Sequence, residues 1–210
     1  MYFIVNKGGN MALTKKAERT KGKLLASARK LISERGFDHV SVEDITKDSG
    51  VAKGTFYHYF KCKEDVVKSL SDETAAASLQ RTLEHEGGVV ERCNFYFLSV
   101  YGDCQWNGVR LVRQWMRESI ETEQMTAETE ETLCYMYTAM EKIVTIHLGE
   151  RKGELSKEAP VEKVCRILVS HLIGVITMWC MLNGSFDISK DPDEYTRMDI
   201  QNLLGPFLIQ

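Results

Sequence analysis

Apolar residues recur along this chain with the 3.6-residue period of α-helices, and no stretch alternates as a half-buried strand does. Glycine and polar clusters separate the apolar runs, and prolines number only three. The pattern therefore predicts an all-α protein of about nine helices. The expected helices are 14–35, 42–48, 53–60, 61–86, 89–106, 107–122, 132–150, 161–182 and 192–208.

Two of the shortest predicted helices lie within residues 41–60, SVEDITKDSGVAKGTFYHYF, and are joined by a tight turn. Ser41 can cap the first helix, with Asp44 three residues later to complete a capping box. Gly50 can adopt a positive φ in the turn without strain. Phe56 faces inward, with a second phenylalanine four residues later on the same side of the second helix. This arrangement is typical of a helix-turn-helix.

The second of these helices leaves an outward face of small, basic and hydroxyl-bearing residues. Such side chains suit phosphates and base edges in a major groove of DNA. The alternative is an ordinary helical hairpin whose polar face is merely solvated. The outward residues are Lys53, Gly54, Thr55, Tyr57 and His58.

Together with its flanks from 36 to 65, this stretch resembles the TetR family of bacterial transcriptional regulators. The resemblance implies an N-terminal three-helix helix-turn-helix module and a C-terminal helical ligand-binding and dimerisation domain. Two residues depart from the family pattern: Ala52 replaces a capping Ser or Thr, and Thr46 replaces a small Ala between the helices. By position, the resemblance implies DNA contacts at Ser41, Lys53, Gly54, Thr55, Tyr57, His58 and Lys63.

Charge divides the chain in the same way. Residues 1–70 hold 14 Lys and Arg against 8 Asp and Glu, a net +6, whereas residues 71–210 hold 13 against 22, a net −9. A basic module followed by an acidic body is expected of a DNA reader with a separate sensing domain. We therefore expect a disordered extension over 1–13, with Met11 as a possible second start, a DNA-binding domain over 14–70, and a ligand-binding and dimerisation domain over 71–210.

The cysteines and the N-terminus bear on the compartment. The six cysteines include no C-x-x-C pair and no zinc-like spacing, and the first residues do not resemble a signal peptide. We expect reduced thiols in a cytoplasm. The apolar stretch 167–182 looks too short to cross a membrane and contains Ser170, His171, Gly174 and Thr177, so we expect no membrane partner. A thiol-based redox sensor using Cys93 and Cys104 remains an alternative function.

An enzyme is not expected, because the sequence lacks the usual catalytic motifs. It has no G-x-G-x-x-G, Walker, G-x-S-x-G or H-E-x-x-H pattern, and no paired Glu-x-x-His motifs for a di-metal site. The sequence predicts neither a cofactor nor a metal site.

The second half of the chain is expected to form a homodimer, because its last two helices carry more apolar surface than one subunit can bury. In the TetR family the last two helices pair with their copies, and a small molecule releases the dimer from a palindromic operator. The expected dimer residues are Val175, Ile176, Trp179 and Leu203. Residues that either line a pocket for an unknown inducer or simply pack in the core are Phe97, Tyr101, Trp115, Met136, Met140, His147, His171 and Met178.

Overall fold

The computed structural model describes residues 15–121, 127–190 and 195–210. Over these residues the chain is helical, and the single extended pairing among them is an isolated antiparallel bridge between Leu155 and Leu208. The predicted all-α class is thus confirmed. The α-helices are α1 (Lys15–Arg35), α2 (Val42–Ser49), α3 (Lys53–Tyr59), α4 (Lys63–Leu83), α5 (Val89–Asn107), α6 (Val109–Glu121), α7 (Ala127–Thr145), α8 (Val161–Met181) and α9 (Tyr195–Leu204), with short 3-10 turns η1 (Phe37–His39) and η2 (Gly205–Phe207).

Helix ends are where the sequence predictions differ from the structure. Helix α7 begins at Ala127 rather than at 132. Helix α9 stops at Leu204, where Gly205 and Pro206 change the backbone to a 3-10 turn. The expected extension over 1–13 and the possible start at Met11 lie outside the described residues.

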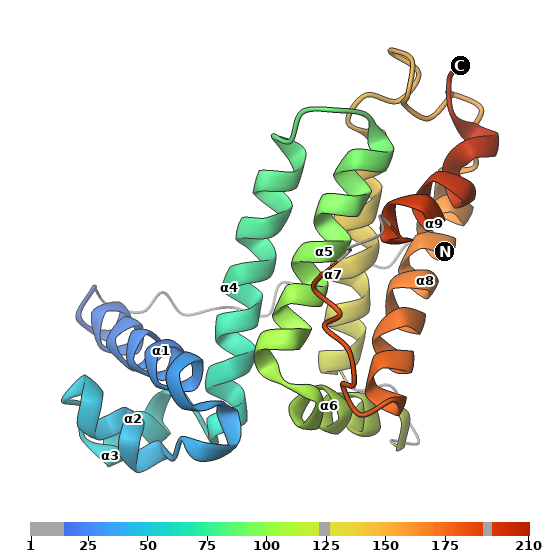
Figure 1. Cartoon of the computed structure of the whole chain (residues 1–210). Coiled ribbons are helices and arrows are strands. Elements are labelled where there is room, and N and C mark those ends of the chain that lie inside the picture. Colours follow the sequence, from blue (N-terminus) through green and yellow to red (C-terminus); the bar gives the residue numbers. More distant parts are fainter. Residues whose placement is uncertain (1–14, 122–126, 191–194) are drawn as a thin grey trace. The chain divides into compact units, whose positions relative to one another are not determined.

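Contacts divide the chain into two units, Met1–Leu70 and Ser71–Gln210, and α4 runs through the division. In the first unit α1 packs against α2, and α2 contacts α3 (Figure 1). The buried residues of these helices are mostly apolar and include Leu24, Ala28, Leu31, Ile32, Ile45 and Phe56. Val66 and Val67, in the first turns of α4, are buried in the same unit.

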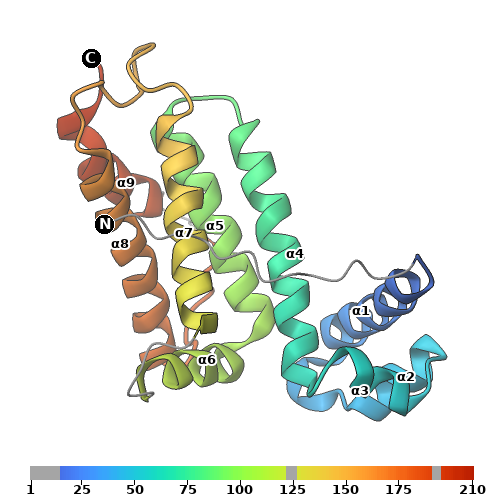
Figure 2. The same ribbon diagram turned by 180° about the vertical axis from the view of Figure 1, so that it is seen from behind.

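The second unit is a helical bundle in which α5, α7 and α8 run side by side (Figures 1 and 2). Helix α9 packs on α5 and α8, while α6 lies across one end of the bundle. One hydrophobic core joins these helices. It includes Tyr96, Phe97, Met140, Ile143, Leu168 and Leu172.

Helix α8 (Val161–Met181) is long and apolar enough to cross a membrane by length and composition. The helix is longer than the apolar stretch 167–182, so its length does not exclude a span. A core helix of a soluble protein passes the same test. One face of α8 is such a core face, since Val164, Leu168 and Leu172 are buried among α5 and α7.

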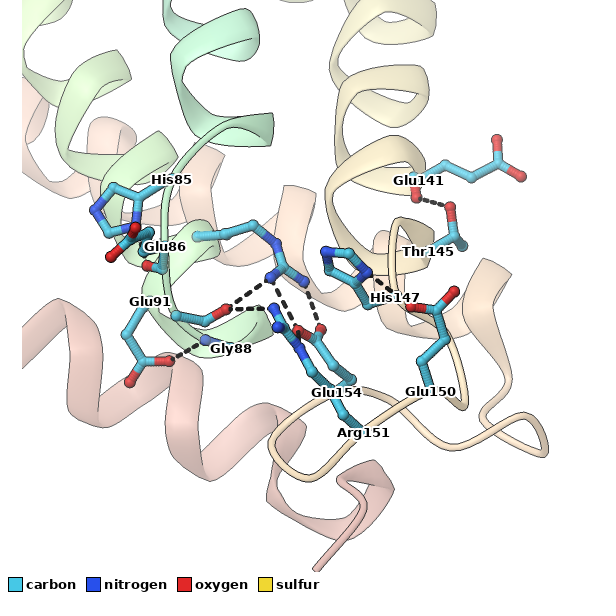
Figure 3. A network of polar contacts seen from close by, with 12 residues as sticks. His85, Glu86, Gly88, Glu91, Glu141, Thr145, His147, Glu150, Arg151 and Glu154 are labelled. Atoms are coloured by element: carbon cyan, nitrogen blue, oxygen red, sulfur yellow. Dashed lines mark hydrogen bonds and ion pairs between the residues drawn. The ribbon is translucent and has the colours of Figure 1, made fainter.

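A buried ion pair connects the loops at one end of the bundle. Arg92 on α5 donates from Nη1 to Glu154 Oε1 at 2.9 Å and from Nη2 to Oε2 at 2.5 Å, with side chains 1% and 0% exposed. Figure 3 shows Arg151 reaching the same carboxylate, at 3.4 Å from its Nε. Both arginines also donate to the carbonyl oxygen of Gly87, at 3.0 and 3.3 Å. The pair therefore joins the α4–α5 turn to the α7–α8 loop.

The C-terminal tail closes this end. Ile209 donates its backbone N–H to the carbonyl of Glu154 at 2.8 Å, and Ser156 donates to the carbonyl of Phe207 at 2.9 Å. Gly153 contributes a third bond, from its N–H to Ile209 O at 3.0 Å. Backbone pairing and the buried ion pair thus hold three chain segments together.

We expect Glu154→Gln to destabilise the protein by about 3–5 kcal/mol, because the change leaves the Arg92 guanidinium buried without a counter-charge. Chemical unfolding followed by circular dichroism measures this loss. The matched control is Glu158→Gln in the same loop, where the glutamate is exposed. Equal unfolding midpoints for the two variants would contradict the role assigned to the buried pair.

Candidate nucleic-acid interface

The turn between α2 and α3 has the local geometry expected from its sequence. Asp44 N donates to Ser41 Oγ at 3.1 Å and Ser41 N donates to Asp44 Oδ2 at 2.9 Å, so the predicted capping box is confirmed. Helix α2 ends at Gly50, whose φ of 66° and ψ of 23° lie in the left-handed region. Val51 N then donates to the carbonyl of Thr46 at 3.1 Å. These contacts fix the angle at which the chain enters α3.

Buried aromatic residues hold α3 in place. Phe56 is fully buried and Phe60 nearly so, and their ring centroids lie 5.6 Å apart, as the four-residue spacing predicts. Helix α2 is tied to α1 through Asp48, which accepts hydrogen bonds from Ser27 Oγ at 2.7 Å and Lys30 Nζ at 2.8 Å. These bonds hold the pKa of the Asp48 carboxyl below its usual value. Aromatic packing under α3 and hydrogen bonds between α1 and α2 therefore hold the outward face of α3 in position.

The start of α3 lacks a side-chain cap, as expected from the alanine at 52. No side chain accepts a hydrogen bond from the first turn there, and the N–H groups of Thr55 and Phe56 donate instead to the carbonyl of Ala52. Thr46, the second departure from the family pattern, is buried and donates from Oγ1 to the carbonyl of Glu43 at 3.0 Å. Packing rather than capping therefore stabilises the short α3.

Helix α3 brings five of the expected DNA-contacting residues together. Lys53, Gly54, Tyr57 and His58 are exposed and Thr55 is half-buried. The Tyr57 side chain is 50% exposed although its ring lies edge-on to Phe56, with centroids 5.4 Å apart. The face thus presents an ammonium, a phenol and an imidazole to solvent. Such groups can donate to phosphate oxygens and base edges.

Lys53 already has a partner within the first unit. Its ammonium donates to the carboxylate of Glu43, in the first turn of α2. The bond raises the pKa of Lys53 and lowers the pKa of Glu43. Sequence reasoning missed Glu43, because the turn geometry rather than any spacing rule brings positions 43 and 53 into contact.

The other two expected DNA contacts have structural duties. The hydroxyl of Ser41 belongs to the capping box and lies 2.5 Å from Asp44 Oδ2. The Nζ of Lys63 donates to the carbonyls of Phe37 and Val40 at 2.7 and 2.8 Å and lies 3.9 Å from the Phe37 ring centroid. Its ammonium stabilises the η1 turn, which gives Lys63 a structural role, and its contact with a phosphate stays a prediction.

In the second unit, several of the expected pocket residues come together in the core. Phe97 lies 6.1 Å from Tyr101 and is stacked at 6.1 Å on His171, measured between ring centroids. His171 Nε2 lies 3.5 Å from Asp199 Oδ2 on α9. Met140 is buried in the same core, and the half-buried Met136 packs against it. Trp115 on α6 is also half-buried.

Two expected pocket residues lie elsewhere. His147 lies just beyond the end of α7, where its Nδ1 is 2.8 Å from the exposed Glu150 carboxylate (Figure 3). Met178 is 48% exposed on α8. Both lie away from the buried cluster around Phe97, because the helical period does not show which face of a helix meets the core. No cluster of metal-binding side chains occurs in the described parts of the chain.

The expected dimer residues divide between inside and outside. Trp179 is 1% exposed and donates from Nε1 to the carbonyl of Phe186 at 3.0 Å, so it belongs to the core of its own subunit. The other three expected residues are half-buried, and they are Val175, Ile176 and Leu203. The exposed apolar residues of α8 lie on another side of the helix, and they are Ile167, Met178 and Met181.

Residues 24–70 match the family model of bacterial regulatory proteins of the TetR family. The chain is 22% identical over 205 residues to the probable HTH-type transcriptional regulator ArpR of Pseudomonas putida, covering 91% of this chain and 95% of that one. A TetR-family regulator from Pectobacterium atrosepticum has the same fold (TM-score 0.65, 19% identity, coverage 95% and 99%). So does FadR from Bacillus subtilis, solved in complex with stearoyl-CoA (TM-score 0.53, 21% identity, coverage 87% and 96%).

We expect Gly54→Ala to separate the stability of α3 from its use as an interface. No heavy atom lies within 4 Å of a Cβ added at Gly54, and alanine stabilises a helix by about 0.5–1 kcal/mol relative to glycine. The variant should therefore melt higher, while its methyl group obstructs close approach of DNA and lowers the affinity for a DNA duplex. Thermal melts and fluorescence anisotropy test both parts. Higher stability with unchanged duplex affinity would remove Gly54 from the interface.

Proposed function

We propose that this chain is a DNA-binding transcriptional regulator of the TetR family, and that it is a homodimeric repressor that a small-molecule inducer releases from a palindromic operator. The observation that carries the proposal is the outward face of α3. Lys53, Gly54, Tyr57 and His58 are exposed together on a helix whose opposite face is anchored by Phe56. A helix that is anchored on one side and exposes hydrogen-bond donors on the other suits the major groove of DNA.

Charge supports the same role. The net +6 over residues 1–70 attracts the phosphate backbone, whereas the net −9 over residues 71–210 repels it. Binding should therefore weaken as salt rises, with a slope of about 0.9 for each phosphate neutralised. We place the chain, a soluble regulator, in the cytoplasm, where it meets its DNA.

The function is tested by selecting bound duplexes from a random-sequence pool with the full-length protein. We expect a palindrome whose half-sites lie about one helical turn apart. The double variant Lys53→Ala/Tyr57→Ala should lose affinity for that duplex with unchanged helical content, because both side chains are exposed. Lys142→Ala, an exposed lysine on α7, is the control. Wild-type affinity in the double variant would show that DNA contacts another surface.

The dimer is proposed on the exposed side of α8. Ile167, Met178 and Met181 are 42%, 48% and 78% exposed, and an apolar helix side of this kind resembles half of a core. Gly174 lies in the same helix, exposed and with no heavy atom within 4 Å of an added Cβ, which allows a second helix to approach closely. A second copy of α8 is a suitable partner, because two-fold symmetry makes the surface self-complementary.

We expect Met178→Glu to give a monomer by multi-angle light scattering and to lose operator affinity. The isolated subunit tolerates the change because Met178 is largely exposed, but a symmetric interface would bury two unpaired carboxylates. Thr138→Glu, an exposed site on α7, is the matched control. A Met178→Glu protein that stays dimeric would move the interface elsewhere, for example to α9.

The inducer site is proposed at Phe97, Tyr101, Met140 and His171. Phe97 of α5 lies near Tyr101 and is stacked on His171 of α8, and Met140 of α7 is buried in the same core. Ligand sites combine apolar walls with a few polar groups. An acyl-CoA is a first candidate to test, since the FadR structure contains stearoyl-CoA. Helix α4 is continuous between the two units, so a ligand that tilts α4 would move α3, the proposed recognition helix.

The redox-sensor alternative is disfavoured by the state of its two cysteines. Burial raises the pKa of both the Cys93 and the Cys104 thiol to about 12. The reactive form of cysteine is the thiolate, so both thiols stay protonated and inert near neutral pH. The inducer-released repressor is therefore the better-supported function.

A further inference from the structure

The three carboxylates of α2 are bound in different ways. Asp44 completes the capping box with Ser41, and Asp48 accepts bonds from α1. These two carboxylates therefore stabilise the fold of the first unit. Glu43 instead binds Lys53, the first residue of the recognition helix. The ammonium expected to contact DNA is thus already occupied by a carboxylate of the same unit.

This pair is open to exchange. The side chains of Lys53 and Glu43 are 52% and 63% exposed, so water and other anions reach both. A lysine ammonium is a compact point charge, and an exposed ion pair holds it only weakly. A DNA phosphate near α3 would compete with Glu43 for the same ammonium.

Glu43 loses its one cationic partner once Lys53 leaves. A backbone hydrogen bond in the first turn of α2 still lowers its pKa, so the carboxylate stays charged, whereas the neighbouring carboxylate of Asp44 repels it. DNA would add further negative charge at the same surface. A carboxylate left there repels the backbone or takes up a cation, and either effect opposes binding.

We infer that Glu43 sets the DNA affinity of this protein by competing with phosphate for Lys53, so that the ammonium changes partner when a duplex binds. The inference rests on the proposed function and assigns a role to a residue outside the expected DNA-contacting set. Under this inference, a DNA phosphate contacts Lys53 only by displacing the Glu43 carboxylate. Affinity is thereby kept below what the basic face alone would supply.

Salt dependence distinguishes this exchange from a plain phosphate contact. In the wild-type protein, the cation taken up by Glu43 offsets part of the counterion release that accompanies the Lys53 contact. Without that carboxylate the offset disappears, so the plot of log affinity against log salt should steepen by up to about one.

The test is a double-mutant cycle of Glu43→Gln, Lys53→Gln and the combined variant in the full-length protein. Affinity is measured by anisotropy over a salt series, with a random-sequence duplex and with the selected operator duplex. We expect Glu43→Gln to bind both duplexes up to about fivefold more tightly at low salt, with the steeper slope. The gain should vanish in the Lys53→Gln background, and Glu34→Gln on α1 should show little change. Glu43→Ser serves in place of Glu43→Gln if the melting temperature of the latter falls.

Each other outcome is informative. An equal gain with and without Lys53 would mean that Glu43 acts by through-space repulsion alone, which overturns the competition. Weaker binding by Glu43→Gln would mean that Glu43 orients Lys53 or contacts a base, and also overturns it. If the wild-type protein binds DNA and Glu43→Gln has the same affinity and salt dependence, the role of Glu43 is rejected but the proposed function is not. A wild-type protein that binds neither duplex overturns the proposed function itself.

Discussion

The proposed DNA-reading face depends on the burial of a few apolar side chains under two helices that are too short to be stable alone. Helices α2 and α3 have 8 and 7 residues, whereas an isolated helix of fewer than about 12–15 residues is marginal in water. Ile45 and Phe56 are fully buried in the first unit's core, and this packing replaces the side-chain cap that α3 lacks. The same burial keeps the opposite side of α3 exposed. Stability and presentation of the interface therefore come from one packing arrangement.

Polar residues of similar type have different roles on that frame. Lys63 is bound to backbone carbonyls and an aromatic ring, which commits it to the fold, whereas Lys53 is held by one exposed carboxylate and can exchange partners. Asp48 and Glu43 form a similar contrast: the first ties α2 to α1, and the second ties α2 to the recognition helix. The available charge on the interface is therefore smaller than the count of lysines suggests.

In the second unit, buried and backbone contacts hold one end of the bundle together, whereas one side of α8 leaves apolar residues exposed. The buried Arg92–Glu154 pair and the paired C-terminal tail hold the end of the bundle where the α4–α5 turn lies. Helix α8 buries Trp179 in this unit yet leaves Met178 and Met181 exposed. Since neighbouring positions on one helix point in different directions, an interface can be built on α8 without disturbing its own core.

The sequence by itself determined the all-α class, the capping box at Ser41, the left-handed turn at Gly50 and the inward face of Phe56. These features depend on residues within a few positions of each other, where period and backbone preference are decisive. Only the tertiary structure decided that Lys63 turns to the η1 carbonyls, that Trp179 faces the core, that His147 lies at a bundle end, and that Glu43 meets Lys53. Each of those outcomes depends on how one helix is rotated and positioned against another. Periodicity places a residue on a helix face, but packing between helices decides what that face contacts.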